Sequence, residues 1–129
     1  EVAGAARKQP YAVALASGQP MAFAGLWEGW RDSASGEVLR SFTILTTDAN
    51  RHLAQLHHRM PVILDRDAWP AWLGDDAATP EDLRALLRPC PDEALLAWPV
   101  APRVGSVRED DPGLIERLPG AADLPHPAR

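Results

Sequence analysis

A histidine and an arginine follow a pair of threonines in the middle of the chain, in the order Thr46-Thr47, His57 and Arg59. An imidazole titrates near neutral pH and can serve as a general acid or base. A guanidinium matches the oxygens of a phosphate group, and hydroxyl groups can donate hydrogen bonds to the same oxygens. These residue types at this spacing therefore indicate an acid–base site for an anionic substrate.

Each of these residues also has a common structural interpretation, which spacing alone leaves open. Threonines are frequent in strands because of their β-propensity, and a histidine or arginine at a helix end is often a capping or surface residue. His52 and His58 lie six residues apart and His57 faces another way, so no pair has the spacing of a helical zinc motif. A glycine-rich phosphate loop is also missing, and we expect neither a metal nor a cofactor.

The one cysteine, Cys90, lies in the string Arg88-Pro89-Cys90-Pro91. The two prolines predict a turn, and a single cysteine permits no internal disulfide. A small filler residue is the common role for such a cysteine. A hydrolase that pairs Cys90 with His57 is a weaker alternative.

Two tryptophans flank Glu28 in the string Gly25-Leu26-Trp27-Glu28-Gly29-Trp30. Alternation along a strand places Trp27 on one face and Glu28 with Trp30 on the other. Filling the core is the usual role of such large side chains, while an exposed tryptophan could stack on a nucleic-acid base. Glu28 itself is more typical of a structural ion pair than of a catalytic acid.

The chain has 129 residues, of which 46% are hydrophobic, and a formal net charge of −5. This length and composition predict one domain with a real core rather than a disordered tail. The negative charge argues against a broad surface for duplex DNA. Because no apolar run approaches the length of a membrane span and no signal-peptide layout opens the chain, we expect a cytoplasmic protein with no membrane partner.

Antiparallel strands are the main elements that would position the candidate residues. Three strands are predicted over residues 11–15, 21–30 and 38–47, with turns at 17–20 and 32–37. This order is typical of an antiparallel meander. Asp48 is a candidate N-cap for a helix through about His57, which Pro61 would end.

Shorter elements are predicted in the second half of the chain. They are a strand at 62–64, a helix capped by Asp65 that must be short or begin near its Pro70, a helix that begins at Thr79-Pro80-Glu81-Asp82, and a strand at 95–100 whose Pro99 is typical of an edge. The predicted class is α+β, an antiparallel β-rich, barrel-like sheet with short peripheral helices. Residues 1–118 would form the domain, and residues 119–129, with three prolines, a loose tail.

Six strings in a fixed order carry a resemblance to a known family. They are Lys8-Gln9-Pro10-Tyr11, Phe23-Ala24-Gly25-Leu26-Trp27-Glu28, Thr43-Ile44-Leu45-Thr46-Thr47-Asp48-Ala49-Asn50, His57-His58-Arg59-Met60-Pro61-Val62-Ile63-Leu64, Ala71-Trp72-Leu73 and Val104-Gly105-Ser106-Val107-Arg108-Glu109-Asp110-Asp111-Pro112. Together they resemble the SOS-response-associated peptidase family, the abasic-site-processing proteins. The resemblance covers about residues 7–118, which would be the C-terminal portion of that domain with an incomplete version of its fold.

The resemblance implies a covalent reaction with single-stranded DNA. In the family, an N-terminal cysteine attacks the ring-opened aldehyde of an abasic site. Its α-amine forms a Schiff base, and its thiol closes that Schiff base to a thiazolidine. The resulting DNA–protein crosslink shields the lesion, and the same N-terminal chemistry resembles the peptidase-like self-processing that gave the family its name.

The resemblance also implies roles for particular residues. The family's histidine in the His-x-Arg-Met-Pro string assists sugar ring opening and crosslink formation or reversal, and it matches His57. Thr46 would contact the lesion or its phosphate, and Arg59 the backbone phosphate. The family's glutamate matches either Glu1 or, as we favour, a residue upstream, since Val2 stands where Trp is expected.

The N-terminal cysteine and an asparagine of the family's front half are not found at matching positions of this sequence. We expect this cysteine and this asparagine upstream of Glu1, so residues 1–129 without them would be inactive. The complete protein is expected to be a bacterial monomer in the cytoplasm. It would act as a crosslinking lyase in the DNA-damage response. Its partner is single-stranded DNA with abasic sites, and it would associate with the nucleoid when bound. The alternative is a truncated remnant with a structural or single-stranded-DNA-binding role and no chemistry.

Overall fold

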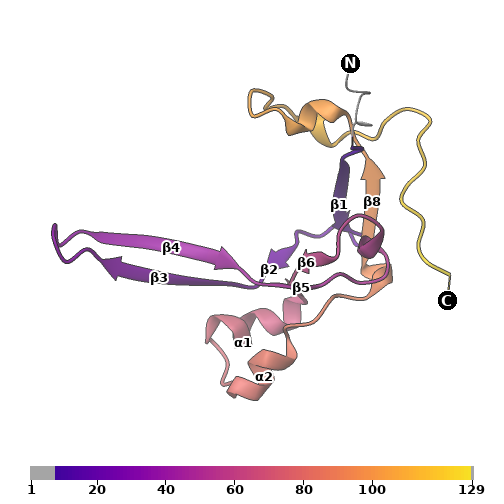
Figure 1. Cartoon of the computed structure of the whole chain (residues 1–129). Coiled ribbons are helices and arrows are strands. Elements are labelled where there is room, and N and C mark those ends of the chain that lie inside the picture. The colour runs from indigo at the N-terminus through magenta and orange to yellow at the C-terminus, as the bar shows by residue number, and fades with distance from the viewer. Residues whose placement is uncertain (1–7, 129) are drawn as a thin grey trace. The chain divides into compact units, whose positions relative to one another are not determined.

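The computed structural model describes residues 8–128, which are the coloured part of Figure 1. The chain divides into two compact units, one made of Glu1–Gln19 with Glu93–Arg129 and the other of Pro20–Asp92. The described residues form strands and a few short helices, which confirms the predicted α+β class. None of the helices in residues 8–128 has the length and apolar character needed to cross a membrane.

The described strands form four separate two-stranded antiparallel sheets. The strands are β1 (Tyr11–Leu15), β2 (Ala22–Phe23), β3 (Gly25–Arg31), β4 (Val38–Ile44), β5 (Thr46–Asp48), β6 (Arg59–Pro61), β7 (Ile63–Leu64) and β8 (Leu95–Pro99). β1 pairs with β8, β2 with β7, β3 with β4, and β5 with β6. The predicted barrel-like sheet is therefore wrong, because these four sheets do not close into a barrel.

The predicted meander is also wrong at its first turn, residues 17–20. Gly18 does make a turn there, since its N–H donates to the carbonyl of Leu15 at 2.9 Å. The chain does not return along β1, however, and Pro20 after the turn has no N–H to offer a ladder. β1 instead pairs over its whole length with β8. This partner is distant in sequence, so local turn signals could not indicate it.

The second predicted turn does form, and it joins β3 to β4. The N–H of Gly36 donates to the carbonyl of Asp32 at 2.8 Å, and Gly36 has a φ of 74°, which costs a glycine little. The Asp32 carboxylate accepts hydrogen bonds from the Ala34 N–H and the Ser35 hydroxyl. These bonds lower the pKa of Asp32.

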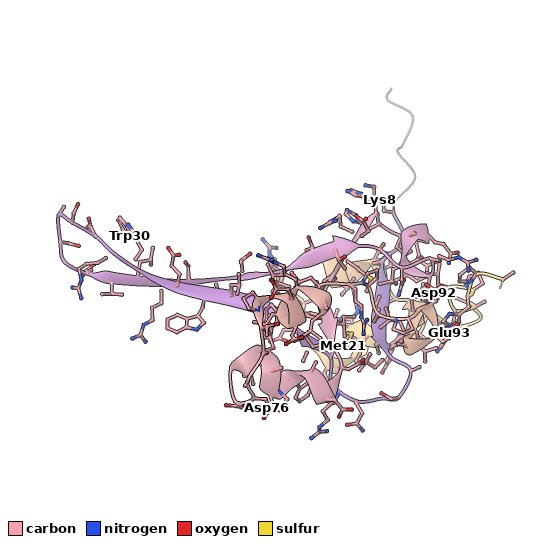
Figure 2. The ribbon with its side chains drawn as sticks, turned by 90° about the horizontal axis from the view of Figure 1, so that it is seen from below. Lys8, Met21, Trp30, Asp76, Asp92 and Glu93 are labelled. Atoms are coloured by element: carbon pink, nitrogen blue, oxygen red, sulfur yellow. The ribbon has the colours of Figure 1, made fainter. Side chains whose placement is uncertain are left out.

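Large apolar side chains stay exposed on both faces of the β3–β4 hairpin. Trp27 and Phe42 oppose each other on one face and are 74% and 79% exposed. Trp30 opposes Leu39 on the other face, is 54% exposed, and projects from the hairpin in Figure 2. The core-filling role predicted for Trp27 and Trp30 is therefore wrong within the described residues. Exposed apolar patches of this kind are typical of surfaces that contact another molecule.

Three backbone positions join the sheets of Pro20–Asp92. Ala24 lies between β2 and β3, Leu45 between β4 and β5, and Val62 between β6 and β7. Ala24 donates its N–H to Val62, Val62 to Leu45, and Leu45 to Ala24, each at 2.9 Å. The three bonds close a ring, from which three strand pairs diverge. We call Ala24, Leu45 and Val62 the three-way junction.

The apolar core of this unit surrounds the three-way junction. Ala24 and Val62 are fully buried and Leu64 is nearly so. Partly buried side chains pack against these three residues, namely Leu45, Trp69, Trp72 and Leu86. The helix α1 (Trp69–Leu73) attaches through two indole N–H groups. Trp69 donates to the carbonyl of Leu64 at 3.1 Å, and Trp72 to that of Gly25 at 3.2 Å. Pro70 is compatible with α1 because it lies in the first turn.

The helix α2 (Pro80–Ala85) begins with the predicted capping box. The Thr79 hydroxyl accepts from the Asp82 N–H at 3.1 Å, and the Asp82 carboxylate accepts from the Thr79 N–H at 2.9 Å. Hydrogen bonding to the Asp82 carboxylate, first by the Thr79 backbone N–H and then by the Thr79 side chain, lowers the pKa of Asp82. The box therefore stabilises the helix above that pKa and weakens as the pH falls through it.

The helix predicted from Asp48 to His57 is wrong, because this segment contains one short 3₁₀ turn, Leu53–Gln55. Asp48 is the last residue of β5, and Pro61 ends the strand β6 rather than a helix. The side chain of Asn50, rather than that of Asp48, bonds to this turn, since its Oδ1 accepts from the Leu53 N–H at 2.9 Å. An asparagine side chain that bonds to nearby backbone in this way favours a turn over a continuous helix.

In the other unit, β8 is bonded on both sides. β1 pairs with one side. The C-terminal segment, residues 115–124, bonds to the other side. The Leu118 N–H donates to the carbonyl of Pro99 at 3.0 Å, and the Leu124 N–H donates to the carbonyl of Ala97 at 2.8 Å. The Trp98 indole donates to the carbonyl of Ile115 at 2.8 Å. The C-terminal segment is therefore bonded to β8 as far as Leu124.

We expect Val62→Ala to lower the free energy of unfolding by about 2 kcal/mol. The change removes two carbon groups from a fully buried position, at about 0.8 kcal/mol each, and leaves a cavity. Urea denaturation measures the loss. Val107→Ala is the matched control, because Val107 is fully exposed and the same change there should stay within about 0.5 kcal/mol. Equal losses at both positions would contradict a core at the three-way junction.

Candidate functional site

The β5–β6 pair brings together two of the residues that the sequence singled out. Its register sets Asp48 opposite Arg59 and Thr46 opposite Pro61. Each strand has only three residues. Leu45 of the three-way junction immediately precedes β5, and Val62 of the junction immediately follows β6. The side chain of Arg59 therefore lies along β5, within reach of Thr46.

The Arg59 guanidinium is held at two points. Its Nη1 donates to Oδ1 of Asp48 at 2.8 Å, and its Nη2 donates to the carbonyl of Thr46 at 2.8 Å and to the Thr46 hydroxyl at 3.1 Å. The Arg59 side chain is 40% exposed and that of Asp48 is 89% exposed. The Thr46 oxygen accepts from Arg59, so its O–H can still donate to a ligand. A phosphate oxygen could therefore meet Thr46 and Arg59 together.

His57 lies two residues before the start of β6 and is exposed. Its backbone N–H donates to the carbonyl of Leu53 at 3.0 Å, which ties it to the 3₁₀ turn. The ring Nδ1 accepts from the Arg59 N–H at 3.0 Å and lies 3.2 Å from the Arg59 carbonyl. With Nδ1 as acceptor, the neutral ring carries its proton on Nε2. Arg59 therefore orients the imidazole through its backbone.

The ring of His58 stacks on the ring of His57. Their centroids are 4.4 Å apart and the ring planes differ by 22°. The His58 carbonyl accepts from the Ala49 N–H at 2.9 Å, which extends the pairing of β5 and β6 by one bond. His58 is thus a neighbour that packs against His57, while the bonds to Arg59 belong to His57.

Three of the four predicted site residues, Thr46, His57 and Arg59, belong to one bonded cluster. The fourth, Glu1, lies outside the described residues. The side chain of His52 is fully buried, and its backbone N–H donates to Asp92 at 3.1 Å. Residues 8–128 contain no group of three or more His, Cys, Asp or Glu side chains that could hold a metal ion.

Asn50 positions the segment that carries His57, a role that the sequence analysis missed. Asn50 is buried. Its N–H donates to the Met60 sulfur at 3.3 Å, and its side-chain amide donates to the carbonyl of Cys90 at 3.0 Å. Together with the bond from the Leu53 N–H to the Asn50 Oδ1, these bonds fix both ends of the loop between β5 and β6. The sequence did hold a signal for this role, because an asparagine side chain often bonds to the backbone N–H three residues later and so favours a turn.

Cys90 is half-buried and has the features of a structural residue. Burial raises the pKa of its thiol, and the negative charges of Asp65 and Asp92 raise the pKa further. The side-chain amide of Asn50 lies 3.8 Å from the sulfur. A raised pKa leaves little thiolate at neutral pH, and the thiolate is the nucleophilic form. This environment argues against the Cys90–His57 hydrolase.

Comparisons with known proteins found a matching family model and similar proteins. Residues 2–107 match the family model of the SOS response associated peptidase (SRAP). The abasic site processing protein YoqW of Bacillus subtilis (strain 168) is 37% identical over 109 residues, which are 84% of this chain and 48% of that protein. The abasic site processing protein HMCES of Gallus gallus is 38% identical over 93 residues, or 71% of this chain and 27% of that protein. The chain thus spans about half the length, or less, of these relatives.

A solved structure has a similar fold. The X-ray crystal structure of a protein from Bacteroides thetaiotaomicron matches with a TM-score of 0.77 and 27% sequence identity. The match covers 90% of this chain and 51% of that chain. The part of this chain outside the match is one tenth of its length, which is shorter than the β3–β4 hairpin from Gly25 to Ile44. The match therefore includes at least part of this exposed hairpin.

We expect Cys90 in the 129-residue chain to react with iodoacetamide at pH 8 several-fold more slowly than free cysteine does. The cause is the raised pKa of its buried thiol, which lowers the thiolate fraction. Mass spectrometry over time measures the rate. A Cys90→Ala/Ser33→Cys variant is the control, since its thiol lies in the exposed β3–β4 turn and should react at the ordinary rate. A Cys90 that reacted faster than this control would restore the hydrolase alternative.

Proposed function

The chain belongs to the SOS response associated peptidase family, and from this premise we propose that it is part of a protein that processes abasic sites in single-stranded DNA. The names of its relatives, which describe abasic site processing in bacteria and in a vertebrate, support the proposal. The cluster of Thr46, His57 and Arg59 supplies the groups that such a substrate requires. These are a proton-transfer group for the sugar and donors for the phosphates that flank it.

The proposed product is a covalent thiazolidine crosslink. The α-amine of an N-terminal cysteine condenses with the sugar aldehyde and releases water, and the thiol then adds across the C=N bond. The one cysteine of residues 1–129 is Cys90, which is internal and has no free α-amine. The covalent step is therefore proposed for the intact natural protein. Lyase-like reversal and peptidase-like self-processing belong to the same proposal.

His57 is proposed to open the sugar ring. An abasic sugar is a closed hemiacetal, so exposing its aldehyde requires loss of a proton from the hydroxyl and gain of a proton by the ring oxygen. The observation that carries this role is that Nδ1 of His57 lies 3.0 Å from the Arg59 N–H and 3.2 Å from the Arg59 carbonyl. One backbone residue can thus support Nδ1 as acceptor or as donor. When Nδ1 carries a proton and donates it to the Arg59 carbonyl, Nε2 of the neutral ring can take a proton, and Nε2–H of the charged ring can give one, without a large ring movement.

Arg59 and Thr46 are proposed to bind backbone phosphate next to the lesion. The chain has a net charge of −5, so general attraction to nucleic acid cannot provide the binding. A local, oriented guanidinium next to a hydroxyl suits a single phosphate contact instead. Glu1, which the structure does not describe, remains a second proposed catalytic residue. The proposed protein acts as a monomer in the bacterial cytoplasm and associates with the nucleoid when bound to DNA.

We expect His57→Asn in the intact natural protein to slow crosslinking to an abasic single-stranded oligonucleotide about 100-fold, the usual contribution of a general acid or base. A denaturing gel over time measures the covalent band. His58→Asn is the matched control, since the His58 ring only stacks on His57 and its loss should cost less than tenfold. Equal losses in the two variants would remove the assigned role of His57.

The unsubstituted protein tests the function itself. A covalent band that requires the abasic site supports the proposal. Tight binding to single-stranded DNA without any covalent band would instead favour the alternative of a binding remnant. If the protein neither binds nor crosslinks to this DNA, the proposed function is rejected.

A further inference from the structure

We propose that Asp48 sets the selectivity of this site by competing with backbone phosphate for Arg59. In the free protein Asp48 holds one end of the guanidinium, and a correctly placed phosphate takes over that end in the complex. The inference rests on the proposed function, because it concerns the same site. It adds a residue to which the sequence analysis gave only a capping role.

The hydrogen bonds of Arg59 allow this exchange. Nη1 bonds to Asp48 at 2.8 Å, whereas Nη2 bonds to the carbonyl and hydroxyl of Thr46. A guanidinium has five N–H donors, and these contacts use at most three of them. Loss of the Asp48 contact therefore leaves the guanidinium anchored by Thr46, so Nη1 can change its partner while Arg59 keeps its place.

The exposure of the ion pair makes the exchange easy. The side chains of Asp48 and Arg59 are 89% and 40% exposed, so water and salt screen their attraction. A phosphate group offers Nη1 the same kind of charge-assisted hydrogen bond. Asp48 sits at the end of a three-residue strand and is exposed, so its carboxylate can turn into solvent.

The resting pair also hides the positive charge of Arg59. A paired guanidinium contributes little net potential, and the chain as a whole has a charge of −5. Nucleic acid that does not place a phosphate at Nη1 then gains little from Arg59. Asp48 is therefore expected to weaken binding to undamaged strands more than binding to a strand that is anchored at its lesion.

The test uses the intact natural protein and an undamaged oligothymidylate, with the dissociation constant measured by fluorescence anisotropy at several salt concentrations. We expect Asp48→Asn to tighten binding several-fold. We also expect the slope of log affinity against log salt to steepen by about 0.7, the value of one additional phosphate contact on a single strand. Asp48→Asn in an Arg59→Gln background should give neither change.

Asp76→Asn is the matched control, because it removes the same charge from the same compact unit. Asp76 lies after α1, is exposed, and is labelled in the helical region of Figure 2. Its loss should leave the salt slope unchanged. Equal effects of Asp48→Asn and Asp76→Asn would reduce the result to net charge and overturn the inference. Weaker binding by Asp48→Asn, at an unchanged melting temperature, would also overturn it, since Asp48 would then only hold Arg59 in place.

Failure of the inference differs from failure of the proposed function. If the unsubstituted protein neither binds oligothymidylate at low salt nor crosslinks to abasic DNA, the proposed function fails. If it binds and crosslinks while Asp48→Asn leaves affinity and slope unchanged, only the role of Asp48 is rejected. A fall in the ratio of abasic to undamaged affinity in Asp48→Asn supports the inference directly.

Discussion

The ring of backbone hydrogen bonds between Ala24, Leu45 and Val62 is the constraint on which the unit Pro20–Asp92 depends. At each of these positions one strand ends and another begins, so the three bonds fix where β2, β4 and β6 end and where β3, β5 and β7 begin. Buried backbone groups must be paired, because an unpaired group in an apolar core is costly. The ring pairs three N–H groups at once, two of them on the fully buried residues Ala24 and Val62, and the small side chain of Ala24 leaves room for the surrounding core.

The candidate site inherits its geometry from this ring. β5 and β6 are too short to hold a register alone, since an isolated two-stranded pair is marginally stable at best. Leu45 immediately before β5 and Val62 immediately after β6 are bonded to each other, which sets Thr46 opposite Pro61 and, two pairs further, Asp48 opposite Arg59. The buried Asn50 closes the other end of the pair through Leu53, Met60 and Cys90. The side chains of the candidate site are exposed, but the backbone that carries them is anchored at both ends.

Local signals in the sequence predicted part of this arrangement well. The capping box at Thr79, the tight turn at Gly36 and the tolerance of Pro70 at a helix start depend on neighbouring residues only, and each is present. The pairing of β1 with β8 depends on residues far apart in the chain, and no local pattern indicates it. Asp48 shows the same limit at the site, because its sequence context is that of an N-cap while its actual partner is a distant arginine. Grouping of His57 with Arg59 was predictable, since both lie on one short segment.

Arg59 takes part in both halves of the proposed chemistry, phosphate binding and proton transfer. Its backbone N–H and carbonyl both lie next to Nδ1 of His57, while its side chain reaches Thr46 and Asp48 on the neighbouring strand. A phosphate that draws on the guanidinium therefore acts on the residue whose backbone orients the imidazole. Because the strand register fixes the backbone of Arg59, binding can change the partner of the side chain without moving the histidine. The side chain of Arg59 would then serve phosphate binding, while its backbone would serve proton transfer by orienting His57. This division explains how so small a pair of strands could serve both roles.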